Sequence, residues 1–473
     1  MTICPESTVS SVQMPSTLTR KPVTETPDVL RWTGFGGAAL LTAGAWATRA
    51  VPVALSAAIA GAGLVVLAWA LLGRTPQDPQ WLRRTLAWWC APLLVAPPLF
   101  SADVFSYLAQ GEVAARGLDP NVVSPASGAS AEAIERVGVY WRDTPSPYGP
   151  LFSTAERAIA EVTGGDPVAG ILLYRLVAVL GLLLVVWAVP RLTKDPSRAF
   201  WLGVLNPLVL WHLVGGVHND ALMLGLMLSG TVVALHALPE SRWWQFTAGV
   251  VLIGLGAQVK LPALIALAVV GTALAKKLGG GWVRFVLAGL SMVAAAVGVS
   301  VLTSAGGSGF GWVQALGTPS KVNSWMAPTN WPGYLVGAVF GPETGQAMIS
   351  SARIAGFVLI LCGIAVVLRH QLRGGVSEVT ALGMMMSLIV VLGPVIQPWY
   401  LLWAVLPLAA CLPVGPWRTR IAVLVGVFAL LVPPLAGNFT GRVPELITAY
   451  ALGIAAVGGA FFVLRRVPVA VQS

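Results

Sequence analysis

The sequence predicts an all-α polytopic membrane protein with about 12–14 transmembrane helices. Of its 473 residues, 56% are hydrophobic and 10% are charged, whereas soluble domains usually carry about 25% charged residues. The mean hydropathy is +0.79, and apolar stretches long enough to cross about 30 Å of hydrocarbon recur along the chain. The net charge of +10 does not indicate nucleic-acid binding, because loop arginines and lysines set the topology of membrane proteins.

The apolar stretches follow a polar N-terminal segment. Residues 1–30 are rich in serine, threonine and proline and are expected to form a disordered cytoplasmic tail. Residues 31–473 are expected to form one transmembrane domain, in which several spans are short or interrupted by proline and glycine. The candidate spans cover residues 32–48, 51–72, 85–100, 169–190, 199–216, 219–238, 244–259, 261–275, 283–303, 349–369, 377–394, 396–413, 418–436 and 444–464.

Basic residues are distributed unevenly between the two sides that alternating spans define. With the N-terminus in the cytoplasm, roughly nineteen of the 29 lysines and arginines fall on the inner side and about eight on the outer side, as the positive-inside rule requires. We therefore expect a multi-pass plasma-membrane protein with both termini in the cytoplasm. Two long loops, 101–168 and 304–348, then face outward, and loops of that length are expected to carry structure and function of their own.

The first outer loop is expected to begin with an interfacial helix around residues 100–111. At helical spacing Asp103, Tyr107 and Gln110 share one face, and a second helix is expected to begin at Pro150. A carboxylate at the bilayer edge is costly, and it suits a proton-accepting role if a substrate hydroxyl can reach it. The alternative is that Asp103 only caps the interfacial helix.

Further polar and aromatic residues lie where the topology places the outer ends of the spans. Trp141 and Tyr148 could form platforms for sugar rings or could equally anchor the chain in the interface. His218, Asn219 and Asp220 follow one another between two spans and could bind phosphate, hydroxyls or a metal. A position in the first turn of the next helix explains Asp220 through the helix dipole, but it does not explain His218.

Several cations lie at unusual places for a membrane protein. Lys260 is the one basic residue at its outer helix junction, so it needs a partner or ligand, unless it snorkels toward the headgroups. Lys321 lies in the second outer loop, four residues before Trp325. Arg175 and Arg353 lie within spans, where a guanidinium could bind a lipid-linked phosphate in bidentate fashion or pair with an acidic side chain.

One more outer turn places Gln397 beside the paired aromatic residues Trp399 and Tyr400. The sequence has no glycine-rich nucleotide loop, no HExxH and no evident paired acidic motif for a metal–nucleotide-sugar complex. A cytoplasmic reaction fed by a nucleotide is therefore not expected.

The stretches that hold these residues resemble the polyprenol-phosphate-mannose-dependent α(1→6)-mannosyltransferases of actinobacteria, which are GT-C membrane glycosyltransferases of lipomannan and lipoarabinomannan synthesis. The resemblance rests on stretches whose order and spacing match together, namely Phe100–Gly111, Gly117–Pro120, Pro147–Pro150, Leu205–Leu210 and Gly215–Asp220. Weaker matches are Val259-Lys260, Lys321 with Trp325, and Pro398–Tyr400.

The resemblance implies a GT-C-like bundle and an aspartate of the first outer loop as catalytic base, which is Asp103 here. It implies inverting transfer of mannose from polyprenyl-phosphate-mannose to the 6-hydroxyl of a lipid-anchored α(1→6)-mannan at the outer face. Within that mechanism the donor phosphate is assigned to Lys260, Lys321, His218 and Arg353. The sugars are assigned to Tyr107, Gln110, Trp141, Tyr148, Asn219, Asp220, Trp325, Gln397, Trp399 and Tyr400.

The expected partners are the lipid donor, the mannan acceptor and membrane lipids, without nucleic acid. No cofactor is expected, although His218 and Asp220 leave a divalent metal open. A transporter or flippase of a lipid-linked sugar also explains the many spans and the intramembrane arginines, but it does not explain the acid-rich loop after the third span. No internal repeat supports it. A structural membrane subunit leaves the clustered outer polar residues unexplained.

Overall fold

The computed structural model describes residues 25–47, 51–75, 77–305, 309–435 and 441–464. These residues form an all-α protein without strands, in which Leu99 and Leu435 make one isolated antiparallel bridge. The expectation of a disordered tail falls largely on residues 1–24, which lie outside the described ranges, and residues 25–30 belong to the first helix.

A helix occupies thirteen of the fourteen predicted spans. Six helices (α2, α9, α11, α14, α16 and α20) are long and apolar enough to cross a membrane by length and composition, so the chain is a polytopic membrane protein. The helices of the bundle are α1 (Glu25–Trp46), α2 (Val51–Leu72), α3 (Pro79–Leu93), α9 (Pro167–Ala188), α11 (Asp220–Ala237), α12 (Trp243–Ala257), α13 (Leu264–Lys277), α14 (Trp282–Ala305), α16 (Pro342–Leu372), α17 (Glu378–Leu392), α18 (Leu401–Cys411), α19 (Pro416–Leu431) and α20 (Val443–Leu464).

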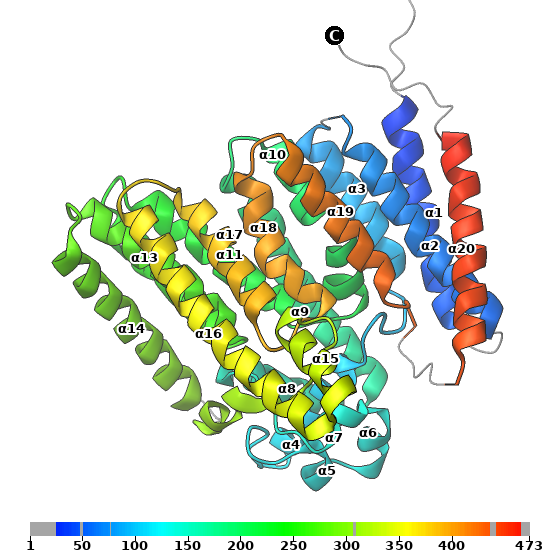
Figure 1. Cartoon of the computed structure of the whole chain (residues 1–473), viewed down its shortest axis with the longest axis horizontal. Helices are drawn as coiled ribbons and strands as arrows, with labels where there is room; N and C mark the ends of the chain where they lie inside the picture. The colour runs from blue at the N-terminus through cyan, green and yellow to red at the C-terminus, as the bar shows by residue number, and fades with distance from the viewer. Residues whose placement is uncertain (1–24, 48–50, 76, 306–308, 436–440, 465–473) are drawn as a thin grey trace, which may run out of the picture.

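The bundle has two different ends (Figure 1). The start of α1 and the end of α20 lie at one end, and the helices of the first long loop lie at the opposite end. These loop helices are α4 (Asp103–Ala115), α5 (Pro125–Gly128), α6 (Ala131–Arg136), α7 (Val139–Arg142) and α8 (Pro150–Thr163). The expectation that this loop carries its own elements is confirmed.

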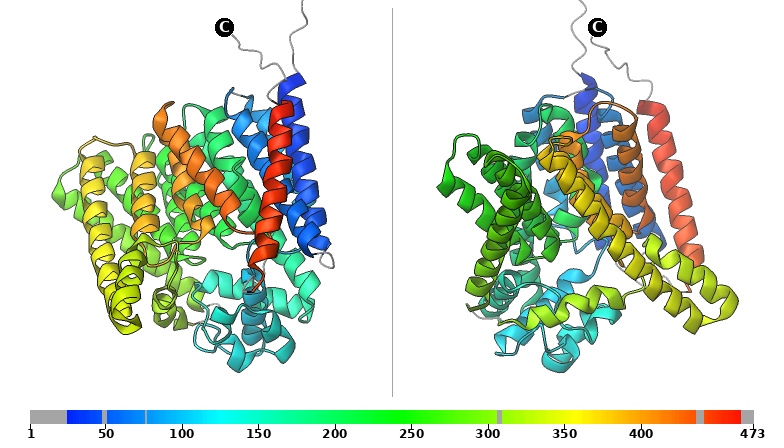
Figure 2. Two further views of the ribbon diagram at one scale, coloured as in Figure 1. Left: turned by 45° about the vertical axis from the view of Figure 1, so that its right-hand side comes forward. Right: turned by 60° about the vertical axis from the view of Figure 1, so that its left-hand side comes forward.

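The second long loop also folds at the end that holds α4 to α8. It contains η5 (Gly311–Lys321), η6 (Pro328–Asn330) and α15 (Trp331–Phe340), and α15 lies beside the first turns of α16 in both views of Figure 2. The two long loops therefore form one extramembrane layer, referred to below as the loop layer.

The third predicted span, 85–100, is shifted in the structure. Helix α3 begins at Pro79, because the side chain of Asp78 accepts hydrogen bonds from the backbone amides of Gln80 and Trp81 and so caps the helix. The helix ends at Leu93, and residues 94–102 continue without regular helix. Asp103 is therefore separated from the third span and begins a helix of its own.

The predicted span 199–216 is not one helix. Short α10 (Pro196–Ala199) is followed by two π-helical segments, η2 (Phe200–Val204) and η3 (Val209–Gly215), with Asn206 between them. Pro207 interrupts the ladder, while the Asn206 side chain accepts from the amide of Leu208. π-Helical turns are frequent at functional sites, and η3 leads directly to His218.

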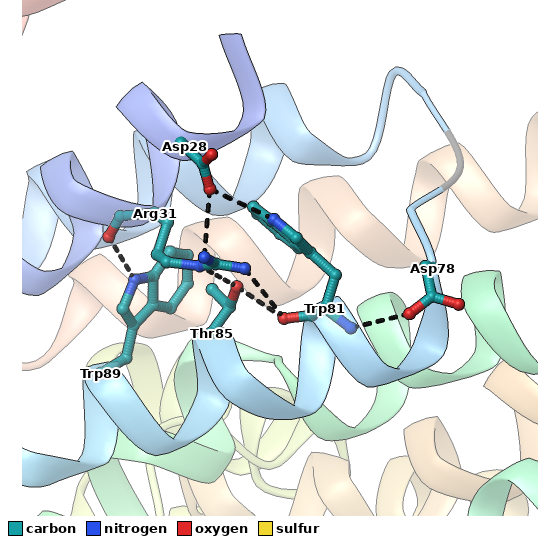
Figure 3. Close-up of polar contacts among 6 residues, drawn as sticks. All are labelled: Asp28, Arg31, Asp78, Trp81, Thr85 and Trp89. Atoms are coloured by element: carbon teal, nitrogen blue, oxygen red, sulfur yellow. Dashed lines mark hydrogen bonds and ion pairs between the residues drawn. The ribbon is translucent and has the colours of Figure 1, made fainter. Parts of the chain in front are cut away.

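Helix α1 is fixed to α3 by a polar cluster (Figure 3). The guanidinium of Arg31 forms an ion pair with Asp28 at 3.0 Å and donates to Thr85 Oγ1 at 2.9 Å. The indole of Trp89 donates to the Arg31 carbonyl at 2.8 Å, and the Trp81 ring lies 4.0 Å below the guanidinium. These contacts hold α3, the helix whose continuation leads to Asp103, against the first helix of the bundle.

Candidate active site

Asp103 begins α4 after a strained turn. The preceding Phe100 is a non-glycine residue at φ 61°, a conformation that a bulky side chain rarely adopts. Its ring stacks on Trp211 at 5.4 Å between centroids, and its amide donates to the Pro434 carbonyl. The Asp103 amide donates to the hydroxyl of Ser101 at 3.1 Å, and the Asp103 side chain is 17% exposed. Contacts from three parts of the chain thus set the direction of this carboxylate.

A second strained turn brings His218 to Asp103. Val217 is β-branched and has φ 58°, and the turn it belongs to is bonded to the first one, since the amide of Leu99 donates to the Gly215 carbonyl at 3.1 Å. A Cβ on Gly216 would lie 2.9 Å from the Leu99 carbonyl oxygen, so the two turns approach too closely for a side chain there. His218 Nδ1 lies 3.5 Å from Asp103 Oδ2. Such strain persists only where the surrounding structure imposes it, and it clusters at functional sites.

The His218 ring is buried and stacked. It lies on Trp399 with 3.9 Å between centroids, and His212 lies 5.5 Å from it. Burial, together with His212 and Lys260, lowers the pKa of His218, which lies in the turn between η3 and α11, so its ring is neutral at pH 7. A neutral ring that carries its proton on Nδ1 can donate to the Asp103 carboxylate.

Lys260 has the partner that its position requires. Its Nζ lies 2.9 Å from Asp220 Oδ2, and the Trp403 indole donates to Asp220 Oδ1 at 2.7 Å. The Asp220 side chain is 0% exposed and that of Lys260 is 15% exposed. The ammonium lies 4.7 Å from the Tyr400 ring centroid and 6.0 Å from that of Tyr148, so cation–π attraction adds to the ion pair.

The environment tunes the carboxylate of Asp103. Burial raises its pKa from 3.8 to about 6, Lys260 and Ser101 oppose the rise, and Asp220 adds to it. The group is therefore mainly ionised at pH 7 and holds a proton more readily than an ordinary aspartate. A pKa near the working pH is what a general base needs.

Aromatic rings form one wall beside Asp103. Tyr107 packs against Tyr148 at 5.4 Å and against Phe152 at 5.1 Å between centroids. The side chain of Asn121 donates to the Tyr148 carbonyl at 2.9 Å and fixes the loop that presents this ring. A Cβ on Gly149 would lie 2.5 Å from the carbonyl oxygen of Gln258, so the loop needs glycine to reach the end of α12.

Several predicted residues present buried polar atoms that make no hydrogen bond within the described ranges. Both amide atoms of Gln110 and of Asn219, the indole nitrogen of Trp399 and Nε2 of His218 belong to this group. Buried polar groups are nearly always hydrogen-bonded in proteins. Donors and acceptors around Asp103 are thus available to a polar ligand.

The structure therefore brings together many of the predicted site residues. Asp103, His218 and Trp399 form one contiguous set, and Asp220, Lys260, Tyr400 and Tyr148 form another. The rings of Trp399 and Tyr400, 5.8 Å apart, join the two sets. We call these seven residues, with Tyr107, the Asp103 cluster.

Other predicted residues have different surroundings. Trp325 is 61% exposed, and its carbonyl accepts from the Trp331 indole. Trp141 lies in α7 with an intermediate exposure. Gln397 precedes the short η7 helix (Pro398–Tyr400) and accepts the Tyr400 amide through its carbonyl. The side chain of Lys321 lies outside the described part of the chain.

The two intramembrane arginines hold loops. The Arg353 guanidinium donates to Asn330 Oδ1, Val322 O and Asn323 Oδ1, each at 2.9 Å, and so ties the second long loop to α16. Arg175 donates to the carbonyls of Leu94 and Ala96 in the segment that leads to Asp103. Both make many neutral hydrogen bonds in place of the acidic partner that the sequence left open.

Sequence reasoning missed Trp403 and Phe152. Trp403 lies within apolar α18 and reads as an ordinary buried residue, although it stacks on Tyr400 at 4.2 Å and donates to Asp220. Phe152 lies in the first turns of α8 and packs on Tyr107. Their helical spacing from Tyr400 and Tyr148, respectively, is the signal that could have found them.

No described set of three or more histidine, cysteine, aspartate and glutamate side chains is arranged to hold a metal ion. His218 and Asp220 were the residues considered for one, and both carboxylate oxygens of Asp220 are engaged by Lys260 and Trp403. The chemistry described below is therefore assigned to side chains of this chain.

Helix α8 carries a buried acid outside the Asp103 cluster. Glu156 is fully buried, neither carboxyl oxygen has a hydrogen-bond partner among the described residues, and burial raises its pKa well above the usual value. A group with a raised folded-state pKa stabilises below its unfolded pKa, about 4.3, and loses that contribution as pH rises. We expect Glu156→Gln to raise the thermal unfolding midpoint at pH 8 and to leave it nearly unchanged at pH 4.5.

The control for this prediction is Glu135→Gln, the same change on the exposed face of α6, which should leave the midpoint unchanged at both pH values. Thermal unfolding in detergent, followed at both pH values, provides the measurement. Equal midpoints for wild type and Glu156→Gln at pH 8 would contradict the assigned protonation state.

Comparison with known proteins identifies two regions of similarity to protein families. Residues 32–276 match the model described as "Alpha-(1->6)-mannopyranosyltransferase, N-terminal domain". Residues 330–462 match the model described as "MptB C-terminal domain". Together the two matches include α4, α8 and every residue of the Asp103 cluster.

Curated relatives carry the same description. The chain is 41% identical to a probable α-(1→6)-mannopyranosyltransferase of Mycolicibacterium smegmatis, over 80% of this chain and 75% of the relative. It is 38% identical to an α-(1→6)-mannopyranosyltransferase of Mycobacterium tuberculosis, over 79% and 72% respectively. It is 33% identical to α-(1→6)-mannopyranosyltransferase B of Corynebacterium glutamicum, over 78% and 66%. No solved structure matches the chain.

Proposed function

This chain belongs to the α-(1→6)-mannopyranosyltransferase family, and we propose that it transfers mannose from polyprenyl-phosphate-mannose to the 6-hydroxyl of an α(1→6)-mannan with inversion at the anomeric carbon. It is a membrane-embedded glycosyltransferase with a sugar donor and a mannan acceptor. The observation that carries the finer proposal is the pairing of a base and a cation, since Asp103, with a pKa raised to about 6, lies near the buried Lys260.

In the proposed reaction Asp103 takes the proton of the acceptor 6-hydroxyl. The acceptor oxygen then attacks the anomeric carbon from the face opposite the phosphate, and the bond between that carbon and the phosphate oxygen breaks. The electron pair leaves with the lipid phosphate, which gains negative charge. A positioned base contributes typically about 10²–10⁴-fold in rate. His218, through Nδ1, holds the Asp103 carboxylate in position.

Lys260 is the cation that we propose for the leaving phosphate. Fixed charges aimed at a developing anion stabilise the transition state, and the site that holds Lys260 is largely shielded from solvent. Asp220 was assigned to the sugars from the sequence, and we now propose that it holds Lys260 in place. Both its oxygens are already hydrogen-bonded, and Trp403 fixes its orientation.

The reaction is proposed to occur on the extracytoplasmic side. The loop layer lies at the end of the bundle opposite the start of α1 and the end of α20 (Figure 1). The distribution of basic residues assigns those two chain ends to the cytoplasm. The Asp103 cluster borders the loop layer, where a donor carried on a lipid and an acceptor outside the membrane can meet.

The experiment that tests the proposal is a transfer assay in detergent micelles. Purified protein is incubated with synthetic polyprenyl-phosphate-mannose and a short α(1→6)-mannoside, and the linkage of the product is determined. An elongated α(1→6)-mannoside is the expected product. Absence of product in micelles, combined with movement of the lipid-linked sugar across sealed vesicles, would instead support the transporter alternative.

The pH dependence of transfer follows from the Asp103 carboxyl. Only the ionised base accepts a proton, so we expect the rate to rise with pH through an inflection near 6 and to fall about tenfold per pH unit well below it. Because Lys260 lowers the pKa of Asp103, Lys260→Met should move the inflection to higher pH. The measurement is kcat/KM from pH 4.5 to 8.5. A flat profile across this range would remove Asp103 from the role of base.

A further inference from the structure

The loop layer contains a cavity that is separate from the Asp103 cluster. Its volume is about 450 Å³, and it lies between the C-terminal end of α4, the turn at residues 117–120 and the outer face of α8. A cavity of a few hundred cubic ångströms is in the range that holds a small ligand. We call it the α4–α8 cavity.

The lining of the α4–α8 cavity is rich in hydrogen-bonding groups. Asp119, Arg157 and Glu161 contribute charged side chains, and Arg157 Nε lies 2.8 Å from Glu161 Oε1. The hydroxyl of Ser153, a residue only 1% exposed, lines the cavity and has no hydrogen-bond partner among the described residues. A buried, unpartnered hydroxyl at the wall of a cavity indicates a ligand that can satisfy it.

The charges of the α4–α8 cavity favour a neutral ligand over an anion. Asp119 and Glu161 carry two negative charges against the one positive charge of Arg157, so a phosphate would meet net repulsion. Carboxylates accept and a guanidinium donates strong hydrogen bonds, which together suit a ligand with several hydroxyl groups. Ala114 and Pro120 supply apolar surface for the C–H face of such a ligand.

The cavity is connected to the Asp103 cluster through a shared wall. Pro120 lines the cavity, and its carbonyl accepts from the Ser146 amide at 2.7 Å. The neighbouring Asn121 donates to the Tyr148 carbonyl at 2.9 Å. Along α4, Asp103 and the cavity residue Ala114 are separated by about 16 Å at 1.5 Å per residue. A sugar ring in the cavity is therefore too far from Asp103 to be the ring that reacts.

We propose that the α4–α8 cavity is a distal acceptor subsite that binds a mannose unit of the mannan chain remote from the reacting unit. This inference rests on the proposed function, since it assumes a mannan acceptor whose reacting end lies at Asp103. The subsite lets the enzyme distinguish a long acceptor from a short one, because only a long chain spans both places.

The test compares acceptors of different length in two cavity variants. Ala158→Trp fills the cavity without removing a polar group, and Arg157→Gln removes its cation. For a long α(1→6)-mannooligosaccharide, such as the hexasaccharide, each variant should raise the acceptor KM about tenfold, which corresponds to about 1.4 kcal/mol. The KM for the disaccharide and kcat for both acceptors should not change. The matched control is Arg136→Gln, which breaks the exposed ion pair with Glu132 on α6 and should change neither KM.

Equal changes for the two acceptors, or no change for the hexasaccharide, would overturn the inference while leaving the proposed function intact. A failure of the wild-type protein to use either acceptor would overturn the proposed function instead. Calorimetric binding of the hexasaccharide then still tests the subsite, because wild type should bind it about tenfold more tightly than Ala158→Trp. Equal affinities would refute the subsite as well.

Discussion

Asp103→Asn is expected to lower the rate of mannosyl transfer by about 10²–10⁴-fold, the usual contribution of a positioned general base. Asparagine keeps the shape of the side chain, but its amide cannot accept the proton of the acceptor hydroxyl. The backbone bond to Ser101 and the stacking of Phe100 on Trp211 do not involve the carboxylate, so the fold should remain. The measurement is kcat with polyprenyl-phosphate-mannose and an α(1→6)-mannoside in detergent.

The matched control is Asp143→Asn, which makes the same change at an exposed aspartate of the same loop and should retain the wild-type rate. Thermal unfolding of both variants separates loss of chemistry from loss of fold. If Asp103→Asn transfers mannose at the wild-type rate, another group accepts the proton and the mechanism fails at its first step.

Removal of Lys260 is the second change with a large expected effect, and it acts on stability as well as on rate. Lys260→Ala leaves the fully buried Asp220 carboxylate without its ion pair. Breaking a buried pair by removing one partner costs about 3–5 kcal/mol. Loss of a group that stabilises a developing oxyanion costs about 10²–10³-fold in kcat. Lys260→Ala should therefore unfold at a clearly lower temperature and transfer mannose slowly.

A double variant separates the two effects. In Lys260→Ala/Asp220→Asn no buried charge is left unpaired, and the asparagine oxygen can still accept from the Trp403 indole. Thermal stability should return toward that of the wild type, whereas kcat should stay low. Recovery of both properties in the double variant would show that Lys260 serves only to neutralise Asp220.

The contacts of Lys260 also explain why a lone lysine is tolerated at this junction. Snorkelling toward the headgroups was one expectation from the sequence, and it is not what the structure shows, since the ammonium is directed to Asp220 and lies near the rings of Tyr400 and Tyr148. The ion pair and the rings together compensate for the loss of hydration. A cation held in this way is fixed before the donor arrives.

Local sequence features predicted most of the helices and the start of the site. The apolar stretches gave the bundle helices, Pro150 and Gly164 gave the limits of α8, where Gly164 adopts the left-handed φ of 60°, and the spacing of Asp103 and Tyr107 gave α4. These features depend on residues close in sequence, so they could be read without knowledge of the fold. The start of α3 was missed because the Asp78 cap was not considered, and 199–216 was predicted as one span because its interruption around Asn206 and Pro207 was not recognised.

The sequence by itself determined that this protein is a helical membrane protein, that its first long loop carries a carboxylate at the start of a helix, and which residues could act with it. Only the tertiary structure decided which of those residues meet. Asp220 and Trp403 are 183 residues apart, and His218 reaches Asp103 through two strained turns bonded to each other. The physical reason is that hydrophobic length and helix caps act within a few residues, whereas the pairing of buried polar groups depends on how distant helices pack.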